Sequence, residues 1–453
     1  MKQTPLSQIA NWCGGRLEQS SELMITEVGI DSRTLSSGGL FVAIVGQKFD
    51  AHEFIEQGKV EQAAAFVVSR PVQTDKPQII VNDTRLALGE LAKQYRQSLN
   101  CVVFTVTGSN GKTTVKEMLA SICGLKGKTI ATVGNLNNDY GMPLTVLSIN
   151  DEDYAVIEMG ANHHGEIRYL THIAQGDVAM ITNAGAAHLE GFGSIDGVAQ
   201  AKGEIFEGLK TDGTAIINKD DVRHSVWLEL ARDKKILTFG FKSDADVTAT
   251  TQAVADGTQV TLTTPKGQVT FTLHLLGTHN VLNALCATAA CLAVGIELEV
   301  IAKGLEAMHP VKGRLQWKQG PKGMRVLDDT YNANPTSLGA ALNVLAALGG
   351  NNWLILGDMG ELGENAKEMH EEAGRLARRA GIERLLSFGT NASYASDYFG
   401  EGGKHFAKAE DLIDTVVREW TGDGAILVKG SRAMQMERFV EALTSNSLKR
   451  EDS

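Results

Sequence analysis

Residues 101–114 read Cys-Val-Val-Phe-Thr-Val-Thr-Gly-Ser-Asn-Gly-Lys-Thr-Thr, and this stretch decides the fold. Its first half is a continuous apolar run, which is typical of a buried strand in a parallel sheet. A glycine-rich turn follows at once, and residues 115–122 continue with apolar side chains at helical spacing. A strand, a glycine-rich turn and a helix in this order predict the first unit of a parallel α/β sheet.

The turn itself carries the strongest chemical signal. A glycine-rich turn between strand and helix aims backbone N–H groups and the helix N-terminus at phosphate oxygens. Lys112 adds a positive charge for the transferring phosphate, and Thr113 can offer its hydroxyl to Mg²⁺. The general G-x-x-x-x-G-K-[ST] pattern is imperfect because Val106 holds its first position, so a glycine-rich turn with a surface lysine is the alternative. The flanking strand and helix favour ATP binding by Thr107, Gly108, Ser109, Asn110, Gly111, Lys112, Thr113 and Thr114.

Length and composition restrict the class of protein. The 453 residues suggest about three domains, at roughly 100 to 200 residues per domain. The hydrophobic fraction of 43% and the charged fraction of 21% are typical of globular proteins. The net charge of −11 argues against a general binder of nucleic acid or of anionic membranes. We see no signal peptide, no apolar stretch near about 18 residues and no C-x-x-C pair, which together predict a cytoplasmic protein with reduced cysteines.

Apolar runs divide the chain into three α/β segments. In residues 1–98, short helical patterns alternate with apolar runs, which predicts a small α/β domain. Residues 99–312 are predicted to form a mostly parallel sheet, with antiparallel hairpins at one edge where Thr and Val alternate between about 245 and 275. Residues 313–453 again alternate apolar runs with helical stretches and predict an open, doubly wound α/β domain.

Two polar side chains follow later strands of the predicted central sheet. Glu158 ends the apolar run 154–158, and a carboxylate at the carboxyl end of a parallel strand faces the crevice where ligands bind. It is therefore a candidate ligand of Mg²⁺. His188 follows the next apolar run, 178–182, at a comparable place. Taken alone, such a histidine is more often structural, but beside Thr113 and Glu158 it is a candidate for the same metal site.

Two further segments are ambiguous from their residues alone. Lys202, in Ala-Gln-Ala-Lys-Gly-Glu-Ile at 199–205, reads on its own as a solvated lysine on a helix. The run Gly-Asn-Leu-Asn-Asn-Asp-Tyr-Gly at 134–141 packs side-chain amides densely. Such a run forms either simple turns or a site for a polar ligand such as a sugar or a peptide.

Together these segments resemble the Mur ligases, the family that extends the peptide of the cell-wall precursor. The likeness runs nearly end to end. The segments that show it are 107–114, Glu-Met-Gly-Ala-Asn at 158–162, Asn-Ala-Gly-Ala-Ala-His-Leu-Glu-Gly-Phe-Gly at 183–193, Gly-Thr-His-Asn-Val-Leu-Asn-Ala at 277–284, Gly-Arg at 313–314 and Asp-Thr-Tyr-Asn-Ala-Asn-Pro at 329–335. The resemblance implies an N-terminal UDP-binding domain, a central ATP-binding domain and a C-terminal, Rossmann-like ligase domain.

Further segments resemble one branch of that family, which adds D-alanyl-D-alanine to UDP-N-acetylmuramoyl-tripeptide. They are 135–139, 356–363 and Val-Lys-Gly-Ser-Arg at 428–432, while Asp-Ser-Arg-Thr at 31–34 and the run 46–54 resemble its UDP-binding segments. The D-[ND]-P-R type of segment found in diaminopimelate- or lysine-adding relatives is absent. The implied reaction is attack of the tripeptide carboxylate on the γ-phosphate of ATP, then attack of the dipeptide amine on the acyl phosphate, which gives the pentapeptide, ADP and phosphate.

The resemblance also implies residue roles. Lys112, Glu158, His188 and Lys202 are expected to carry catalysis, and Thr113, Glu158, His188 and Lys202 to hold two Mg²⁺ ions, Lys202 as a carbamate. Asn283 is expected to contact adenine, and Arg314 and Asp329 the ribose and phosphates. The expected substrate contacts are Ser32, Arg33, Gly46, Asp50, His52, Asn135, Asn138, Asn332, Asn334 and Asp358. The dipeptide is expected near Asp358 and the 332–334 turn, where closure of the C-terminal domain excludes water.

Four other functions share part of this pattern. A folylpolyglutamate synthetase would share the central and C-terminal domains but lack the N-terminal UDP-binding unit. A P-loop kinase would share only the phosphate loop and should not need His188 or the segment around Asn283, and a non-enzymatic nucleotide-gated binding module is a further alternative. Another Mur ligase, one that adds diaminopimelate or lysine, is the nearest alternative. Nothing in the sequence demands a nucleic-acid or membrane partner, or more than a monomer.

Overall fold

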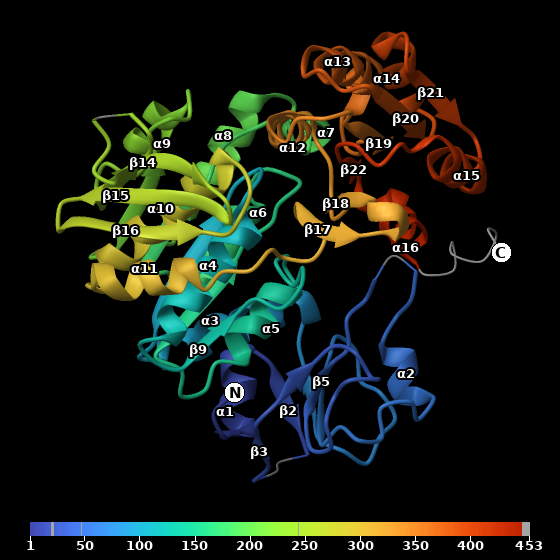
Figure 1. Ribbon diagram of the computed structural model, residues 1–453. Helices are drawn as coiled ribbons and strands as arrows, with labels where there is room; N and C mark the ends of the chain where they lie inside the picture. Colours follow the sequence, from blue (N-terminus) through green and yellow to red (C-terminus); the bar gives the residue numbers. More distant parts are fainter. Residues whose placement is uncertain (20–21, 47, 243, 446–453) are drawn as a thin grey trace.

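A computed structural model gives the structure of residues 1–19, 22–46, 48–242 and 244–445. In this part of the chain the strands form one five-stranded, two six-stranded, one three-stranded and one two-stranded sheet. Helices lie against these sheets along the whole chain (Figure 1). The predicted α/β class is therefore confirmed. The predicted domain boundaries after residues 98 and 312 stay predictions.

The N-terminal part is built on the five-stranded sheet. In spatial order its strands are β2 (Arg16–Glu18), β7 (Gln78–Ile80), β6 (Ala65–Val68), β5 (Leu40–Val42) and β4 (Val28–Gly29). All neighbours are parallel except β2 and β7. The remaining elements here are β1 (Thr4–Pro5), which pairs with β3 (Met24–Ile25), and the helices α1 (Leu6–Trp12) and α2 (His52–Glu56). Strands β5 and β6 are buried on both faces, as parallel strands usually are.

Helix α3 (Thr84–Gln97) joins the N-terminal part to the next sheet. The side chain of Asp83 caps its first turn by accepting from the N–H groups of Arg85 and Leu86. The helix packs against α1 on one side and against α5 and α6 of the central part on the other. One hydrophobic core therefore runs without interruption from the N-terminal sheet into the central one.

The central sheet is parallel throughout. Its spatial order is β13 (Lys235–Phe239), β12 (Thr214–Asn218), β11 (Val178–Ile181), β8 (Val102–Thr107), β10 (Tyr154–Glu158) and β9 (Thr129–Ala131). After β8 the chain first forms β9 and β10 on one side of that strand, and then forms β11, β12 and β13 on its other side. The strand order therefore reverses at β8, and ligands of open α/β sheets bind at the carboxyl ends of strands at such a point.

Helices cover both faces of this sheet. One face carries α4 (Lys112–Gly124), α10 (Thr278–Ala293) and α11 (Leu298–Glu306). The other carries α5 (Gly141–Leu147), α6 (Glu166–Ala174), α8 (Ile195–Gly203), the short helix η1 (Glu204–Phe206) and α9 (His224–Leu230), while α7 (Leu189–Phe192) precedes α8. The strands are apolar on both sides because each face packs against helices.

The predicted antiparallel hairpins form a sheet of their own. Its strands are β14 (Thr248–Val254), β15 (Gly257–Thr264) and β16 (Gly267–Leu273). A single bridge, between Phe239 and Val247, links this sheet to the edge strand β13. Alternate side chains such as Val260 and Leu262 are buried in the core shared with α10 and α11, so the hairpins lie face-on against helices beside the main sheet.

The C-terminal sheet is doubly wound, as the sequence predicted. Its order is β17 (Gln316–Gln319), β18 (Arg325–Asp329), β22 (Ile426–Lys429), β19 (Trp353–Gly357), β20 (Arg384–Phe388) and β21 (Gly403–Phe406), and only β17 is antiparallel to its neighbour. Helices α12 (Pro335–Ala347), α13 (Ala366–Arg379) and α14 (Ala392–Phe399) pack on one face. Helices α15 (Ala409–Glu419) and α16 (Glu437–Thr444) pack on the other, and η2 (Pro321–Gly323), η3 (Gly363–Asn365) and η4 (Arg432–Met434) are short 3₁₀ turns.

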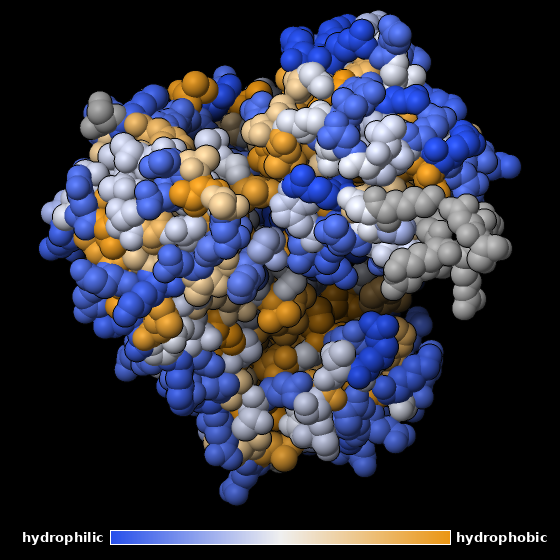
Figure 2. Space-filling model, viewed as in Figure 1, coloured by the Kyte–Doolittle hydropathy of each residue, from blue (hydrophilic) through white to orange (hydrophobic). Residues whose placement is uncertain are grey.

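The remaining features of the fold are a surface hollow, the burial of the cysteines and the character of the helices. Figure 2 shows a hollow with largely apolar walls between the N-terminal part, near α2, and the C-terminal part, near β17 and α16. All five cysteines are buried and form no disulfide, which confirms that they are core residues, and their reduced state stays a prediction. Within the described ranges, we find no helix with both the length and the apolar character needed to cross a membrane.

Candidate active site

The phosphate loop lies at the carboxyl end of β8, where the strand order reverses. Gly108 and Gly111 have φ values of 151° and 84°, which favour glycine. A Cβ atom on Gly108 would lie 1.8 Å from Oγ1 of Thr182, and one on Gly111 would lie 2.4 Å from Oδ1 of Asn283. The glycines therefore let the loop fold tightly onto its neighbours. Since α4 begins at Lys112, the free N–H groups of its first turn complete an anion-binding end.

Lys112 folds back over its own loop. Its Nζ donates a hydrogen bond of 2.8 Å to the carbonyl of Gly108. Burial lowers the pKa of Lys112, the carboxylate of Glu158 opposes that change, and the guanidinium of Arg314 adds to it. The ammonium of Lys112 therefore lies against the phosphate loop. A phosphate oxygen bound there would replace the carbonyl of Gly108 as its hydrogen-bond acceptor.

Thr113 and Glu158, predicted as partners in one metal site, are in direct contact. Oγ1 of Thr113 donates to Oε2 of Glu158 at 2.9 Å, and both side chains are buried. Nδ2 of Asn137 donates to the other carboxylate oxygen at 2.9 Å. Nη2 of Arg314 donates to Oγ1 of Thr113 at 2.8 Å. A hydroxyl and an oriented carboxylate, both oxygen donors, therefore converge beside the phosphate loop.

Lys202 is not the solvated lysine that its local sequence indicates. It is only 1% exposed. Among the described residues its Nζ has no hydrogen-bond acceptor and no carboxylate partner, and it lies 5.7 Å from the ring centroid of Phe192. Burial, and then the nearby charge of Lys112, lower the pKa of Lys202 well below its usual value. The structure thus favours a neutral amine at this position.

His188 meets the C-terminal part of the chain. It has a left-handed backbone with φ of 55°, and its ring packs edge-on against Phe192. Its Nδ1 lies 2.5 Å from Oε2 of Glu361, a close contact in which the nitrogen has no aligned hydrogen bond. The contact with His188 lowers the pKa of Glu361. The predicted metal ligand therefore touches a carboxylate from another part of the chain.

Three family models match consecutive parts of the sequence. They are "Mur ligase family, catalytic domain" at residues 24–96, "Mur ligase middle domain" at 106–291 and "Mur ligase, glutamate ligase domain" at 313–432. The UDP-N-acetylmuramoyl-tripeptide–D-alanyl-D-alanine ligase of Escherichia coli (strain K12) is 45% identical over 447 residues, which are 97% of this chain and 98% of that protein. The chain belongs to the Mur ligase family.

Solved structures support the fold of this Mur ligase. A crystal structure of MurF from Acinetobacter baumannii is 37% identical, covers 98% of this chain and 99% of its own, and superposes with a TM-score of 0.93. MurF from Thermotoga maritima in complex with ADP is 27% identical, with coverages of 94% and 98% and a TM-score of 0.83. The three-part α/β architecture expected from the resemblance is therefore confirmed.

Two of the three residues expected to contact the nucleotide, Asn283 and Arg314, lie at the phosphate loop, and the third, Asp329, lies at the end of a strand of the C-terminal sheet. Asn283 is buried against Gly111, and its Nδ2 donates to Oδ1 of Asn280 at 3.1 Å. The guanidinium of Arg314 stacks over a neighbouring tyrosine ring and reaches the hydroxyl of Thr113. Asp329 ends β18 and accepts a 2.6 Å hydrogen bond from the buried ammonium of Lys429. The Mur ligase thus gathers these residues at the junction of its central and C-terminal sheets.

The residues expected to bind the dipeptide lie in the C-terminal part. Asp358 accepts from the N–H groups of Thr390 at 3.0 Å and Ala392 at 2.7 Å, so its carboxylate also holds the start of α14. It lines a groove of about 720 Å³ together with Glu190 and Glu361. The turn 332–334 lies instead beside the phosphate loop, where Nδ2 of Asn334 donates to Oδ1 of Asn110, and Asn332 is exposed.

The residues expected to bind the UDP end follow the carboxyl ends of β4 and β5. Ser32 and Arg33 come after β4, and the exposed guanidinium of Arg33 pairs with Asp31. Gly46, Asp50 and His52 follow β5, and Gly46 donates its N–H to the carbonyl of Phe49. His52 is fully buried, with Nδ1 at 2.5 Å from Asp50 and Nε2 accepting from the N–H of Ser69. Both ring nitrogens of His52 therefore already have partners inside this part of the chain.

The asparagine side chains of the amide-rich run 134–141 have three different environments. Asn135 is exposed, and Oδ1 of Asn138 accepts from the N–H of Gly141 at 2.9 Å at the start of α5. Asn137 lies between them and reaches Glu158. We did not single out Asn137, Glu361, Lys429 or Phe192 from the sequence. The signal for each was the run that contains it, which is 134–141 for Asn137, 183–193 for Phe192, 356–363 for Glu361 and 428–432 for Lys429.

Proposed function

We propose that this Mur ligase joins the amine of D-alanyl-D-alanine to the terminal carboxylate of UDP-N-acetylmuramoyl-tripeptide, and that it uses ATP and releases ADP and phosphate. The observation that carries this proposal is the convergence of Lys112, Thr113, Glu158 and Lys202 on the phosphate loop. The full-length likeness to the Escherichia coli ligase that bears this reaction in its name supports it. That likeness includes the N-terminal part, which a folylpolyglutamate synthetase was expected to lack.

We further infer one substrate for each part of the chain. Residues 1–98 bind the UDP end through Ser32, Arg33 and the 46–52 segment, and residues 99–312 bind ATP. Residues 313–453 bind the dipeptide in the groove that Asp358 lines. Asn135 and Asn138 lie on the side where the precursor's peptide approaches Glu158. We infer that the protein acts in the cytoplasm as a monomer, and its net charge of −11 argues against a nucleic-acid or anionic-membrane partner.

The residues present suit Mg²⁺ without a preformed protein cage. Across the described residues there is no group of three or more His, Cys, Asp or Glu side chains arranged around one point. Mg²⁺ commonly takes one or two carboxylates and completes its shell with phosphate oxygens and water. Thr113, Glu158, His188 and a carbamoylated Lys202 would hold two such ions, which would neutralise phosphate charge. The hydrogen bond from Asn137 orients Glu158 for that purpose.

Lys202 is suited to become a carbamate. Only a neutral amine attacks CO₂, and the burial of Lys202 near Lys112 favours that form. The nitrogen forms a bond to the carbon of CO₂ and loses one proton, which leaves a carboxylate-like group. Conversion would therefore replace a buried amine, which has no hydrogen-bond acceptor among the described residues, by an anion that attracts Lys112.

The reaction brings several anions together. The carboxylate of the tripeptide attacks the γ-phosphate, so Lys112 and the first-turn N–H groups of α4 must stabilise the shared charge. ADP is the leaving group of this step. The dipeptide amine then forms the amide bond and phosphate leaves. No protein nucleophile is required, and closure of the C-terminal part keeps water from the acyl phosphate.

Phosphate release in the presence of each substrate combination tests the proposal. We expect release only when UDP-N-acetylmuramoyl-tripeptide, D-alanyl-D-alanine and Mg·ATP are all present, with the pentapeptide as product. Lys112→Ala should abolish turnover and leave the circular dichroism spectrum unchanged. Release that does not depend on the dipeptide would contradict the assigned reaction, and a fully active Lys112→Ala variant would contradict the role of the loop.

A further inference from the structure

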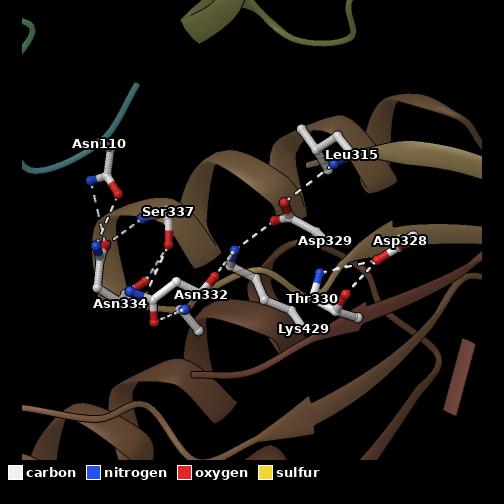
Figure 3. A network of polar contacts seen from close by, with 10 residues as sticks. Asn110, Leu315, Asp328, Asp329, Thr330, Asn332, Asn334, Ser337 and Lys429 are labelled. Carbon is white, nitrogen blue, oxygen red and sulfur yellow. Dashed lines mark hydrogen bonds and ion pairs between the residues drawn. The ribbon is translucent and has the colours of Figure 1, made fainter. Parts of the chain in front are cut away.

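One side chain of the phosphate loop reaches across to the C-terminal part. Nδ2 of Asn334 donates to Oδ1 of Asn110 at 2.9 Å, and Nδ2 of Asn110 lies 3.5 Å from Oδ1 of Asn334 (Figure 3). The two residues are 224 positions apart. Two primary amides that face one another in this way form a neutral pair whose geometry is specific, since each amide has one donor side and one acceptor side.

The backbone of Asn110 is held by the central sheet. Its N–H donates to Oδ1 of Asn183 at 3.0 Å, and its carbonyl accepts from Oγ1 of Thr182 and Nδ2 of Asn183. The position of the Asn110 side chain is therefore fixed by the loop conformation. A change in that conformation must move the amide that meets Asn334.

Asn334 is held equally firmly on its own side. Its Oδ1 accepts from the N–H of Ser337 at 2.8 Å, and Oγ of Ser337 accepts from the N–H of Asn334 at 3.0 Å. This reciprocal capping box starts α12, with Pro335 at the first helical position. Cap formation uses the oxygen of the Asn334 amide and leaves its NH₂ group directed at the phosphate loop.

Lys429 fixes the turn that carries Asn334. It is 2% exposed, and its Nζ donates to the carbonyl of Asn332 at 2.9 Å and to Oδ2 of Asp329 at 2.6 Å (Figure 3). The other oxygen of Asp329 accepts from the N–H of Leu315 at 3.3 Å. The residue before Leu315 is Arg314, whose guanidinium reaches Thr113. The hydrogen bonds of Lys429 and Asp329 therefore hold the two segments that carry Asn334 and Arg314, and each of these residues contacts the phosphate loop or the helix that follows it.

We propose that Asn334 and Asn110 are positioning residues, and that their amide pair clasps the C-terminal part onto the phosphate loop. The clasp sets the distance between the dipeptide, bound on one side, and the γ-phosphate, bound on the other. This inference rests on the proposed ligase function. It assigns Asn334 to domain placement, whereas the family resemblance led us to expect a direct substrate contact.

The Asn334→Ser variant removes the contact with Asn110 and keeps the N-terminal cap of α12. Serine is a good N-cap residue, so α12 keeps its first-turn acceptor, but the shorter side chain cannot reach Asn110. Ser337→Ala is the matched control, because it removes the serine hydroxyl from the same capping box and leaves the amide pair in place. Asn110→Ser removes the clasp from the loop side and keeps the backbone contacts of that residue.

Steady-state kinetics give the first readout. Loss of one hydrogen-bonded pair corresponds to a fall of about 3- to 10-fold in kcat/KM for D-alanyl-D-alanine. We expect this fall in Asn334→Ser and in Asn110→Ser, and no further fall in the double variant, because both changes break the same contact. Ser337→Ala should stay within about 2-fold of the parent. If the two single losses multiply in the double variant, each residue acts separately and the clasp is refuted.

The second readout does not depend on turnover. Val222 and Glu401 are exposed, one in the central and one in the C-terminal part, whereas the native cysteines are buried. Spin labels on cysteines introduced at these two positions report the distance between the parts in the presence of Mg·ADP. We expect a narrow distance distribution in the parent and in Ser337→Ala, and a broad one in Asn334→Ser. An unchanged distribution in Asn334→Ser would overturn the clasp, and a parent without ligase activity would overturn only the proposed function.

Discussion

Replacing Lys202 by methionine should stabilise the central part of the chain and abolish ligation. The ammonium of Lys202 is buried without an acceptor among the described residues, and its pKa is lowered by burial and by Lys112. A lysine whose pKa is lowered on folding must lose its proton in the folded state or hold a charge in an apolar site. Both cost free energy relative to the unfolded chain. Methionine has a similar length, carries no charge and removes this cost.

The size of the effect follows from proton linkage. Between the lowered pKa of folded Lys202 and the usual value of 10.5, the unfolded chain binds one proton more than the folded chain. In that window the free energy of unfolding of the parent rises by about 1.4 kcal/mol per pH unit through this group. The Lys202→Met variant lacks this contribution. Its advantage over the parent should therefore shrink by about 1.4 kcal/mol for each pH unit within that window.

Denaturant unfolding in CO₂-free buffer measures this difference. A three-part chain need not unfold in one step, so the probe must report on the central part. Trp227 is suitable because it is fully buried there and its Nε1 donates to the carbonyl of Ala199, one helical turn before Lys202. The background for this measurement replaces the remaining tryptophans, Trp12, Trp317, Trp353 and Trp420, by phenylalanine.

Two results would refute the reasoning. A stability difference that stays constant over this pH range would mean that folded Lys202 keeps its usual pKa. A variant less stable than the parent at pH 8 would mean that the ammonium has a favourable partner. Added bicarbonate provides a further control, since carbamate formation should stabilise the parent by mass action and leave Lys202→Met unchanged.

Three shorter predictions concern other contacts. Asn137→Ala removes a donor from Glu158, so the Mg²⁺ concentration for half-maximal phosphate release should rise about 10-fold or more, and an unchanged requirement would exclude this role. Gly108→Ala places a Cβ 1.8 Å from the hydroxyl of Thr182, so titration with ATP should show affinity weakened about 10-fold or more, and parental affinity would exclude the tight turn. Arg96 is 1% exposed and donates to three backbone carbonyls and a carboxylate, so Arg96→Lys should cost about 2 kcal/mol and lower the calorimetric Tm by about 2 degrees, and an unchanged Tm would contradict this.

The phosphate loop and the pairing of Thr113 with Glu158 could be predicted because their signals are local. A strand followed by a glycine-rich turn and a helix has few possible geometries, and parallel strands bring their carboxyl ends to one edge. Glu158 ends β10, which is paired with β8, so its distance from the loop is set by sheet register. Any sequence with this pattern in this strand order would bring the two side chains together.

The environment of Lys202 could not be predicted in the same way. Its helix, α8, carries small and apolar residues on several sides, and the local run does not show which side is buried. The ring beside its ammonium belongs to Phe192 and the charge that lowers its pKa belongs to Lys112, and both residues come from other elements. His52 is a similar case, because a polar motif placed it among the substrate contacts and only the fold shows that Asp50 and Ser69 occupy its ring nitrogens.

The proposed metal ligands connect the site to the placement of the C-terminal part. Thr113 is in contact with Arg314 and His188 with Glu361, and both of these partners come from beyond residue 312. A metal–nucleotide complex that takes Thr113 or His188 must compete with these contacts or rearrange them. Nucleotide binding and domain placement are therefore linked, and such a linkage is reciprocal. A dipeptide that favours one placement of the C-terminal part must change the affinity for Mg·ATP by the same factor by which Mg·ATP changes the affinity for the dipeptide.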